Sequence, residues 1–287
     1  MSAQPIRIVI PTGRMYDAVR QLLEDAGLNI PQTAKNYRPV ADDPRFRIKL
    51  LKAANIPTLL ELGAHDLGFS GTDWVRESGA GVDNLLDTGL LPVRVVSAAP
   101  AGYDPFGKSP GRPIVVASEY ENITTDYMKS KKVDFRFVRT YGATEVFPPE
   151  DADLIVDNTA TGSALAANRL EIVDELLSST TCFLANPTAM GQPGIREAAE
   201  DLTLLMRSVL EARRRVLLEM NVDGACLEQV VAMLPAMKSP TVQPLSGNSA
   251  VSVKVAVLKE AVPQLIPRLK RAGATDILET RIRRVTP

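Results

Sequence analysis

The sequence predicts an α/β protein with two lobes and a smaller C-terminal domain. Its 287 residues exceed what one small core needs and suit two or three lobes. Up to about residue 212, short runs rich in β-branched residues alternate with amphipathic stretches of helical length, a pattern typical of α/β proteins. The remaining residues follow the order βαββαβ, which is that of the ferredoxin-like fold.

The first lobe is predicted over residues 1–100. A strand at 6–10 leads into a turn and an amphipathic helix at 15–26, which places Val19, Leu22 and Leu23 on one face. The elements expected after it are a strand at 46–51, a helix at 56–62, a strand at 67–71, a helix at 74–77 and a strand at 91–98.

A second round of the same alternation predicts another lobe over residues 101–185. The Pro- and Gly-rich segment 100–113 is a predicted hinge. The expected elements are strands at 114–117, 134–140 and 154–156, a helix at 124–131, a helix beginning near 164, and an exit segment at 182–185. A long helix at 195–215 follows, so residues 186–212 are assigned to the first lobe. Such sheets bind ligands beyond the carboxyl ends of their strands, so we expect a cleft between the lobes.

The tail, residues 213–287, is predicted as a separate domain. We expect strands at 216–221, 241–244, 251–257 and 277–284, with helices at 225–234 and 262–272. Gly273 lies where a helix C-terminus favours glycine. This order predicts a regulatory or oligomerising domain.

Composition excludes several function classes. The 33 basic residues nearly balance the 34 acidic ones, so no net field attracts nucleic acid or a membrane surface. The single histidine, His65, makes histidine metal sites and Ser-His-Asp triads improbable, and a structural role is expected for it. We predict two buried, reduced thiols at Cys182 and Cys226. With no signal peptide or membrane span recognisable, a cytoplasmic protein is expected.

The segment from Asp157 to Leu165 gives the clearest indication of a ligand-binding site. Asp157 comes directly after a predicted buried strand, and the loop Thr161-Gly162-Ser163 lies where a helix is predicted to begin. A phosphate group could accept hydrogen bonds from the backbone N–H groups and the two hydroxyls of this loop. Gly162 has no side chain and so permits the close approach. Asp157 is placed to accept hydrogen bonds from sugar hydroxyls, so the pattern favours a ribose 5-phosphate, with an ordinary capped turn as the alternative.

Three further glycine turns follow predicted strands. They are Thr12-Gly13-Arg14, Gly71-Thr72-Asp73 and Gly142-Ala143-Thr144-Glu145. Each is ambiguous alone, but together they indicate a ligand rich in phosphate groups.

In this order, these segments resemble the ATP phosphoribosyltransferase family of histidine biosynthesis, in its long form. The resemblance extends over Lys52–Pro57 and, in the tail, over Met220-Asn221, Leu234-Pro235, Ser239–Thr241 and Lys270–Ala274. It implies a two-lobed catalytic unit like the periplasmic binding proteins and an ACT-like tail that binds histidine as a feedback inhibitor. It also implies a homohexamer built from dimers, and Mg²⁺ carried in by phosphoribosyl pyrophosphate.

The resemblance implies a role for individual residues. Asp157 and Glu145 would be catalytic. The phosphoribosyl pyrophosphate site would comprise Asp157, Thr159, Thr161, Gly162, Ser163, Ala164 and Leu165. The ATP site would comprise Thr12, Gly13, Arg14, Lys52, Gly71, Thr72 and Asp73. The histidine site would include Asn221, Leu234, Ser239, Thr241 and Ala274.

Two alternatives remain open at this point. Five positions depart from the family pattern, namely Thr12, Lys52, Asn55, Ala160 and Ala164. A divergent phosphoribosyltransferase with another acceptor would account for them. A two-lobed binding protein without catalysis is the other alternative, although two carboxylates in the cleft would not suit a binder of a plain anion.

Overall fold

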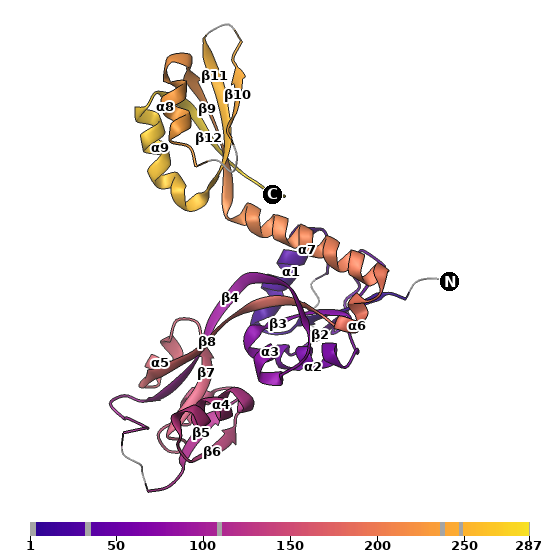
Figure 1. Ribbon diagram of the computed structural model, residues 1–287, viewed down its shortest axis with the longest axis vertical. Helices are drawn as coiled ribbons and strands as arrows, with labels where there is room; N and C mark the ends of the chain where they lie inside the picture. The colour runs from indigo at the N-terminus through magenta and orange to yellow at the C-terminus, as the bar shows by residue number, and fades with distance from the viewer. Residues whose placement is uncertain (1–3, 32–35, 108–110, 236–238, 247–248, 287) are drawn as a thin grey trace. The chain divides into compact units, whose positions relative to one another are not determined.

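The computed structural model describes residues 4–31, 36–107, 111–235, 239–246 and 249–286. The chain forms two compact units, residues 1–24 with 28–203, and residues 25–27 with 204–287. The first unit contains an eight-stranded sheet and the second a four-stranded sheet (Figure 1).

The first unit is built on one mixed sheet with the strand order β2-β1-β3-β8-β4-β7-β5-β6. Its strands are β1 (Ile6–Pro11), β2 (Phe46–Leu51), β3 (Leu67–Gly71), β4 (Asp83–Pro100), β5 (Ile114–Ser118), β6 (Phe135–Arg139), β7 (Leu154–Thr159) and β8 (Leu170–Ala185). The parallel group β1, β2 and β3 forms lobe I, and the parallel group β5, β6 and β7 forms lobe II. The predicted two-lobed α/β architecture is confirmed.

Strands β4 and β8 are long and pair with each other through both lobes (Figure 1). In lobe I, β3 pairs antiparallel with β8 and ends with Gly71 opposite Thr181. In lobe II, β7 pairs antiparallel with β4 and ends with Thr159 opposite Arg94. Since β3 and β7 run in opposite directions, the carboxyl ends of both groups meet at the middle of the β4–β8 pair. This topology creates the site between the lobes.

The hinge predicted at residues 100–113 is wrong. The connections between the lobes are β4 and β8, and residues 94–98 of β4 already pair with β7. The Pro- and Gly-rich segment comes between β4 and β5, which both pair with β7 in lobe II. Residues 83–90 and 170–181 were not predicted as strands because they are polar and lack a clear period-2 alternation.

Helices alternate with these strands along the chain. They are α1 (Arg14–Ala26), α2 (Ile56–Glu61), α3 (Thr72–Ser78), α4 (Glu121–Lys131), α5 (Ser163–Ala167), α6 (Pro187–Met190) and α7 (Pro193–Arg213), with short 3₁₀ turns η1 (Ala53–Asn55) and η2 (Thr144–Val146). Helix α4 begins three residues before its predicted start. The Glu77 carboxylate of α3 accepts from the backbone N–H groups of Asn122 (3.1 Å) and Ile123 (3.0 Å) and so caps it. A cap supplied by another helix is invisible in the local sequence.

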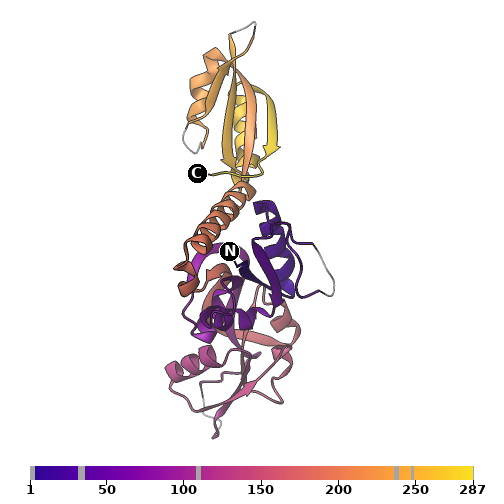
Figure 2. The same ribbon diagram turned by 90° about the vertical axis from the view of Figure 1, so that its right-hand side faces the viewer.

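The tail has the predicted order βαββαβ. Its elements are β9 (Arg215–Asp223), η3 (Gly224–Cys226), α8 (Leu227–Ala232), β10 (Thr241–Pro244), β11 (Ala250–Leu258), η4 (Lys259–Ala261), α9 (Val262–Arg271) and β12 (Ala274–Arg281). The sheet is antiparallel in the order β10-β11-β9-β12, and its helices cover one face (Figure 2). Alternate residues of β9 from Val216 to Val222 are buried and join Leu265 and Leu269 of α9 in one core. The ACT-like assignment stays a prediction.

Candidate active site

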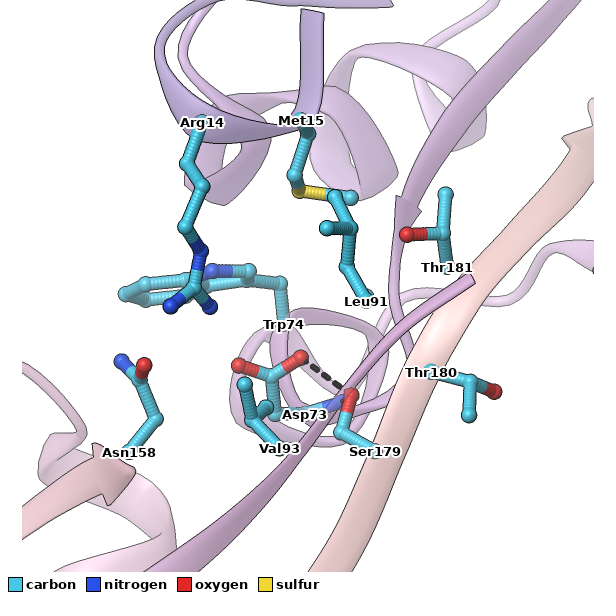
Figure 3. Close-up of a pocket in the computed structure, with 11 residues that line it drawn as sticks. Arg14, Met15, Asp73, Trp74, Leu91, Val93, Asn158, Ser179, Thr180 and Thr181 are labelled. Atoms are coloured by element: carbon cyan, nitrogen blue, oxygen red, sulfur yellow. Dashed lines mark hydrogen bonds between the residues drawn. The ribbon is translucent and has the colours of Figure 1, made fainter. Parts of the chain in front are cut away.

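A pocket of about 210 Å³ lies where the carboxyl ends of the strands of both lobes meet (Figure 3). It is lined by Arg14, Met15, Gly71, Asp73, Trp74, Leu91, Val93, Asn158, Ser179, Thr180 and Thr181. Figure 3 shows Arg14, Asp73 and Asn158 directed toward it from three different elements. The cleft predicted between the lobes is therefore present.

Lobe I contributes the turns that follow β1 and β3. Arg14 is the first residue of α1, and Asp73 lies in the first turn of α3. At Gly71 a Cβ atom would overlap Asp73 Oδ1 and lie 3.2 Å from Ser179 Oγ. Glycine is thus required here by space, because any side chain would displace the Asp73 carboxylate.

Residues of the long strands β4 and β8 line the pocket. The pairing of β4 with β8 is irregular on both sides of Leu90, and Leu91 has a φ of 51°. A bulky residue in the left-handed region costs roughly 1–3 kcal/mol. The surrounding pairing holds this strained residue against the pocket, next to Ser179, Thr180 and Thr181.

A buried hydrogen-bond network crosses the pocket wall from lobe I to lobe II. The Asp73 carboxylate accepts from the Ser179 hydroxyl (2.6 Å) and from the Tyr120 hydroxyl (2.6 Å). The Asn158 amide donates to the same Tyr120 oxygen (2.9 Å), and the Tyr120 ring stacks on Trp74 with centroids 4.4 Å apart. Burial, followed by the adjacent Asp73 charge, raises the pKa of Tyr120 far above its usual range. Tyr120 is therefore a permanent donor that joins the two lobes.

Replacing Tyr120 by phenylalanine is expected to lower the free energy of unfolding by about 1–3 kcal/mol, because the buried Asp73 carboxylate loses a donor. Urea unfolding of the full chain measures the change. Tyr141→Phe is the matched control, since Tyr141 is 84% exposed. Equal free energies for Tyr120→Phe and the wild type would contradict this role.

The predicted phosphate loop directly follows β7. Gly162 has a φ of 81° and donates its N–H to the buried Thr159 Oγ1 (2.9 Å), which shapes the loop. A Cβ at Gly162 would meet nothing within 4 Å, so the space in front of it is open. Thr161 and Ser163 are exposed and hydrogen bonded to each other (3.0 Å). Backbone and hydroxyl donors thus surround an open space, as a phosphate group requires.

Three carboxylates gather at the end of β7. Burial raises the pKa of Asp157 to about 6, and the charges of Glu119 and Glu145 contribute to the rise. The backbone N–H of Asn158 (2.7 Å) and the Thr144 hydroxyl oppose this shift by hydrogen bonding to the carboxylate. A carboxyl group with a strongly raised pKa in a cleft is typical of a functional site. The structure therefore brings the two predicted acids, Asp157 and Glu145, close to each other.

Comparisons with known proteins identify the family of the chain. The family model "ATP phosphoribosyltransferase" matches residues 52–208, and that of the HisG C-terminal domain matches residues 212–284. An ATP phosphoribosyltransferase of Chlorobium phaeovibrioides is 37% identical over 97% of this chain and 96% of its own. That of Pelotomaculum thermopropionicum is 36% identical over 98% and 99%.

The chain belongs to the ATP phosphoribosyltransferase family. A solved structure, the ATP phosphoribosyl transferase (HisG:HisZ) complex from Thermotoga maritima, is also similar. It covers 70% of this chain and 98% of its own with a TM-score of 0.62 and 26% identity. Residues 212–284 match the C-terminal family model, which identifies the long form.

The residues expected at the ATP site of this family are only partly brought together. Arg14, Gly71 and Asp73 line the pocket. Thr12, Gly13, Lys52 and Thr72 do not line it. The Thr72 hydroxyl instead donates to the Thr180 carbonyl (3.3 Å), which ties α3 to β8. Beyond the loop, the Leu165 side chain is buried in the core of lobe II, so only its backbone could contact a ligand.

Sequence reasoning missed eight residues that line the pocket. They are Met15, Trp74, Leu91, Val93, Asn158, Ser179, Thr180 and Thr181. Two sequence features could have predicted some of them. Asn158 lies beside Asp157, and residues 178–181 all carry hydroxyl groups. Leu91 and Val93 depend on the path of β4, and Trp74 on stacking against Tyr120, which no local pattern reveals. Met15 follows Arg14 at the start of α1.

The residues expected to bind histidine do not form one cluster in the tail. Asn221 and Ala274 lie on the paired strands β9 and β12. Thr241 lies on β10, which β11 separates from β9, and Ser239 lies two residues before β10. Leu234 packs against the core. The sequence resemblance could not reveal this separation because it depends on strand order.

Several other expectations concern groups outside the pocket. Both cysteines are free, and Cys182 is buried as predicted, but Cys226 is only partly buried. Among the described residues, no group of three or more His, Cys, Asp or Glu side chains could hold a metal ion. No helix in the described part of the chain is long and apolar enough to cross a membrane.

Proposed function

We propose that this chain transfers the phosphoribosyl group of phosphoribosyl pyrophosphate to N1 of the adenine of ATP and releases pyrophosphate, the first step of histidine biosynthesis. The observation that carries the proposal is the junction of the two lobes. Asp157 lies within β7 and the open Gly162 loop follows that strand, while Asn158 of β7 lines the pocket together with Arg14 and Asp73 of lobe I. This arrangement suits two ligands that meet between the lobes.

The reaction requires little acid–base catalysis by the protein. The lone pair of adenine N1 forms a bond to C1′ while the C1′–O bond breaks and its electron pair leaves with pyrophosphate. The Gly162 loop would hold the 5-phosphate and Asp157 the ribose hydroxyls. The carboxylates of Asp157 and Glu145 would stabilise the positive charge that develops on the ribose ring. Alignment of the two substrates supplies much of the remaining rate enhancement.

Magnesium is proposed to arrive bound to phosphoribosyl pyrophosphate. When bound it neutralises the departing pyrophosphate. Among the described residues no group of acids could hold the ion by itself, so the pyrophosphate oxygens would supply most of its ligands, with the Asp157 or Glu145 carboxylate as an additional oxygen donor.

Pyrophosphate release tests the function directly. The full-length protein is incubated with phosphoribosyl pyrophosphate, Mg²⁺ and ATP. Release that requires ATP supports the proposal. If phosphoribosyl pyrophosphate binds but release requires another base instead, the chain is a phosphoribosyltransferase with a different acceptor. Binding of phosphoribosyl pyrophosphate without release under any acceptor would indicate the binding protein without catalysis.

We further propose that the tail is an ACT-like domain that binds histidine as a feedback inhibitor, within a homohexamer built from dimers. The family membership of the tail supports this. In a single chain the expected contact residues lie toward opposite edges of its sheet. A site completed by a second copy would reconcile their separation. Sedimentation with and without histidine tests the assembly, and a monomer under both conditions would contradict it.

Replacing Asn221 by alanine is expected to raise the histidine concentration for half-inhibition by about tenfold, the loss of one hydrogen bond of about 1.4 kcal/mol. Thr241→Ala at the opposite edge is expected to act likewise if two copies form the site. Glu260→Gln, an exposed change in η4, is the control. Unchanged half-inhibition in both variants would place histidine elsewhere.

A further inference from the structure

Lobe I carries a second pocket, of about 220 Å³, which the proposed reaction does not use. It is lined by Arg7, Arg38, Arg47, Ile48, Lys49, Leu59, Ala64 and His65. Five of these eight side chains are basic or imidazole groups. A concentration of positive charge in a concave site favours an anionic ligand.

The topology of the sheet separates this pocket from the candidate active site. Arg7 and Arg47 pair in register near the amino ends of β1 and β2. Lys49 lies two residues after Arg47 and so on the same face of the strand. His65 precedes β3, whereas Arg14 and Asp73 follow the carboxyl ends of β1 and β3. The two pockets therefore lie toward opposite ends of these parallel strands.

Most of the positive charge in this pocket is uncompensated. Arg7 is paired with Asp66, to which its Nη2 and Nε atoms donate at 2.5 and 3.1 Å. In the part of the chain that the structure describes, the side chains of Arg38, Arg47 and Lys49 have no carboxylate partner. Three cations around one cavity repel one another unless an anion lies among them.

His65 adds an observation that is independent of these cations. The residue is 7% exposed, and its Nδ1 atom is buried without a hydrogen-bond partner among the described residues. Burial, and then the charges of Lys49 and Arg7, lower the pKa of this imidazole, so it is neutral at pH 7. A buried polar atom normally has a partner. The ring therefore lines the pocket as a neutral group and reports on the charges beside it.

We propose that this pocket binds a small phosphate-bearing anion. Guanidinium groups match phosphate oxygens through paired N–H donors, and the Lys49 ammonium adds a point charge. The neutral His65 ring lies in the wall of the pocket and adds no further positive charge to it. Monovalent anions would satisfy fewer donors and compensate less charge. The pocket is thus a binding site additional to that for the two substrates.

The solitary histidine makes the proposal directly measurable. Untagged protein labelled with ¹⁵N-histidine has one imidazole to observe by NMR, because His65 is the only histidine. It is titrated with inorganic phosphate, with pyrophosphate and with AMP, while sodium chloride keeps the ionic strength constant. We expect the His65 ring signals to move saturably with at least one of the two inorganic anions at millimolar concentrations or below. Signals that do not move with either anion would overturn the proposal.

Variants separate binding in the pocket from indirect effects. Arg47→Gln and Lys49→Gln are each expected to weaken the response at least tenfold. Arg136→Gln is the matched control, because Arg136 is an exposed arginine on β6, the opposite edge strand of the same sheet. It should leave the titration unchanged. Thermal unfolding checks that each variant is folded, and Arg38→Gln replaces any variant that is not.

The nucleotide titration distinguishes the sources of the phosphate group. A response to AMP that Arg47→Gln weakens would identify a nucleotide phosphate as an additional ligand. A response to AMP alone that survives Arg47→Gln would originate in the active site, and it would overturn the proposal. Equal weakening by Arg136→Gln and Arg47→Gln would overturn it as well, because it would indicate a nonspecific effect of net charge.

Discussion

Replacing Asp157 by asparagine is expected to lower kcat/KM for phosphoribosyl pyrophosphate by about 10- to 200-fold, because a hydrogen bond to a charged group is worth roughly 1.5–3 kcal/mol. The same substitution is expected to stabilise the folded protein. In the folded state the pKa of Asp157 is raised from 3.8 to about 6, mainly by burial. Ionising this group at neutral pH therefore costs stability, which the neutral amide does not.

The sign and the pH window of this stabilisation follow from proton linkage. The folded protein holds the Asp157 proton more tightly than the unfolded chain does, so this group's contribution to stability falls as pH rises from about 4 to 6. Above that window the variant is expected to exceed the wild type by up to about 3 kcal/mol. Below pH 4 the difference should vanish.

Urea unfolding at pH 4 and pH 8, with steady-state kinetics at pH 8, measures both effects. Asp126→Asn is the control, because Asp126 is an exposed carboxylate on α4 in the same lobe. It should change neither quantity. A variant at Asp157 that is fully active, or that is less stable than the wild type at pH 8, would contradict the assignment.

Replacing Gly162 by valine is expected to abolish binding of phosphoribosyl pyrophosphate. The residue has a φ of 81°, and a Cβ atom at this position would face open space in which the 5-phosphate would lie. A valine would place a branched side chain in that space. It would also cost about 1–2 kcal/mol of stability, because L-residues disfavour the left-handed region.

Calorimetry with phosphoribosyl pyrophosphate measures the loss, and Gly102→Val separates occlusion from backbone strain. Gly102 has a φ of 75°, and a Cβ atom added there would likewise meet no atom within 4 Å, but it lies outside the phosphate loop. Its variant should lose similar stability and still bind the ligand. Binding by Gly162→Val with unchanged affinity would exclude the loop as the phosphate site.

Helix α3 of lobe I makes several contacts with lobe II beside the pocket. Asp73 and Trp74 contact Tyr120, and Glu77 caps α4. These contacts join a helix of lobe I to the start of a helix of lobe II beside the pocket. Substitutions at this junction are thus expected to affect stability as well as catalysis, which is why Tyr120→Phe is a useful probe.

Most elements, and the chemistry of one loop, could be predicted from the local sequence. Alternating β-branched runs predicted the short parallel strands, because buried strands need apolar side chains on both faces. The order of Asp157, Gly162 and Ser163 after a strand predicted a phosphate loop, since a strand–turn–helix junction dictates its geometry locally. The βαββαβ order of the tail was equally readable, because valines alternate with other residues over 251–257 as in a half-buried strand.

Which residues share the pocket depends on tertiary contacts instead. The path of β4 and β8 places Leu91 and Ser179 beside Arg14, although they are distant in sequence. Burial and the approach of Glu145, rather than the identity of Asp157, raise the pKa of that acid. Burial and the charges of Lys49 and Arg7 likewise lower the pKa of His65. Strand pairing and desolvation depend on contacts between residues that are far apart in the sequence. A local sequence pattern therefore does not predict them.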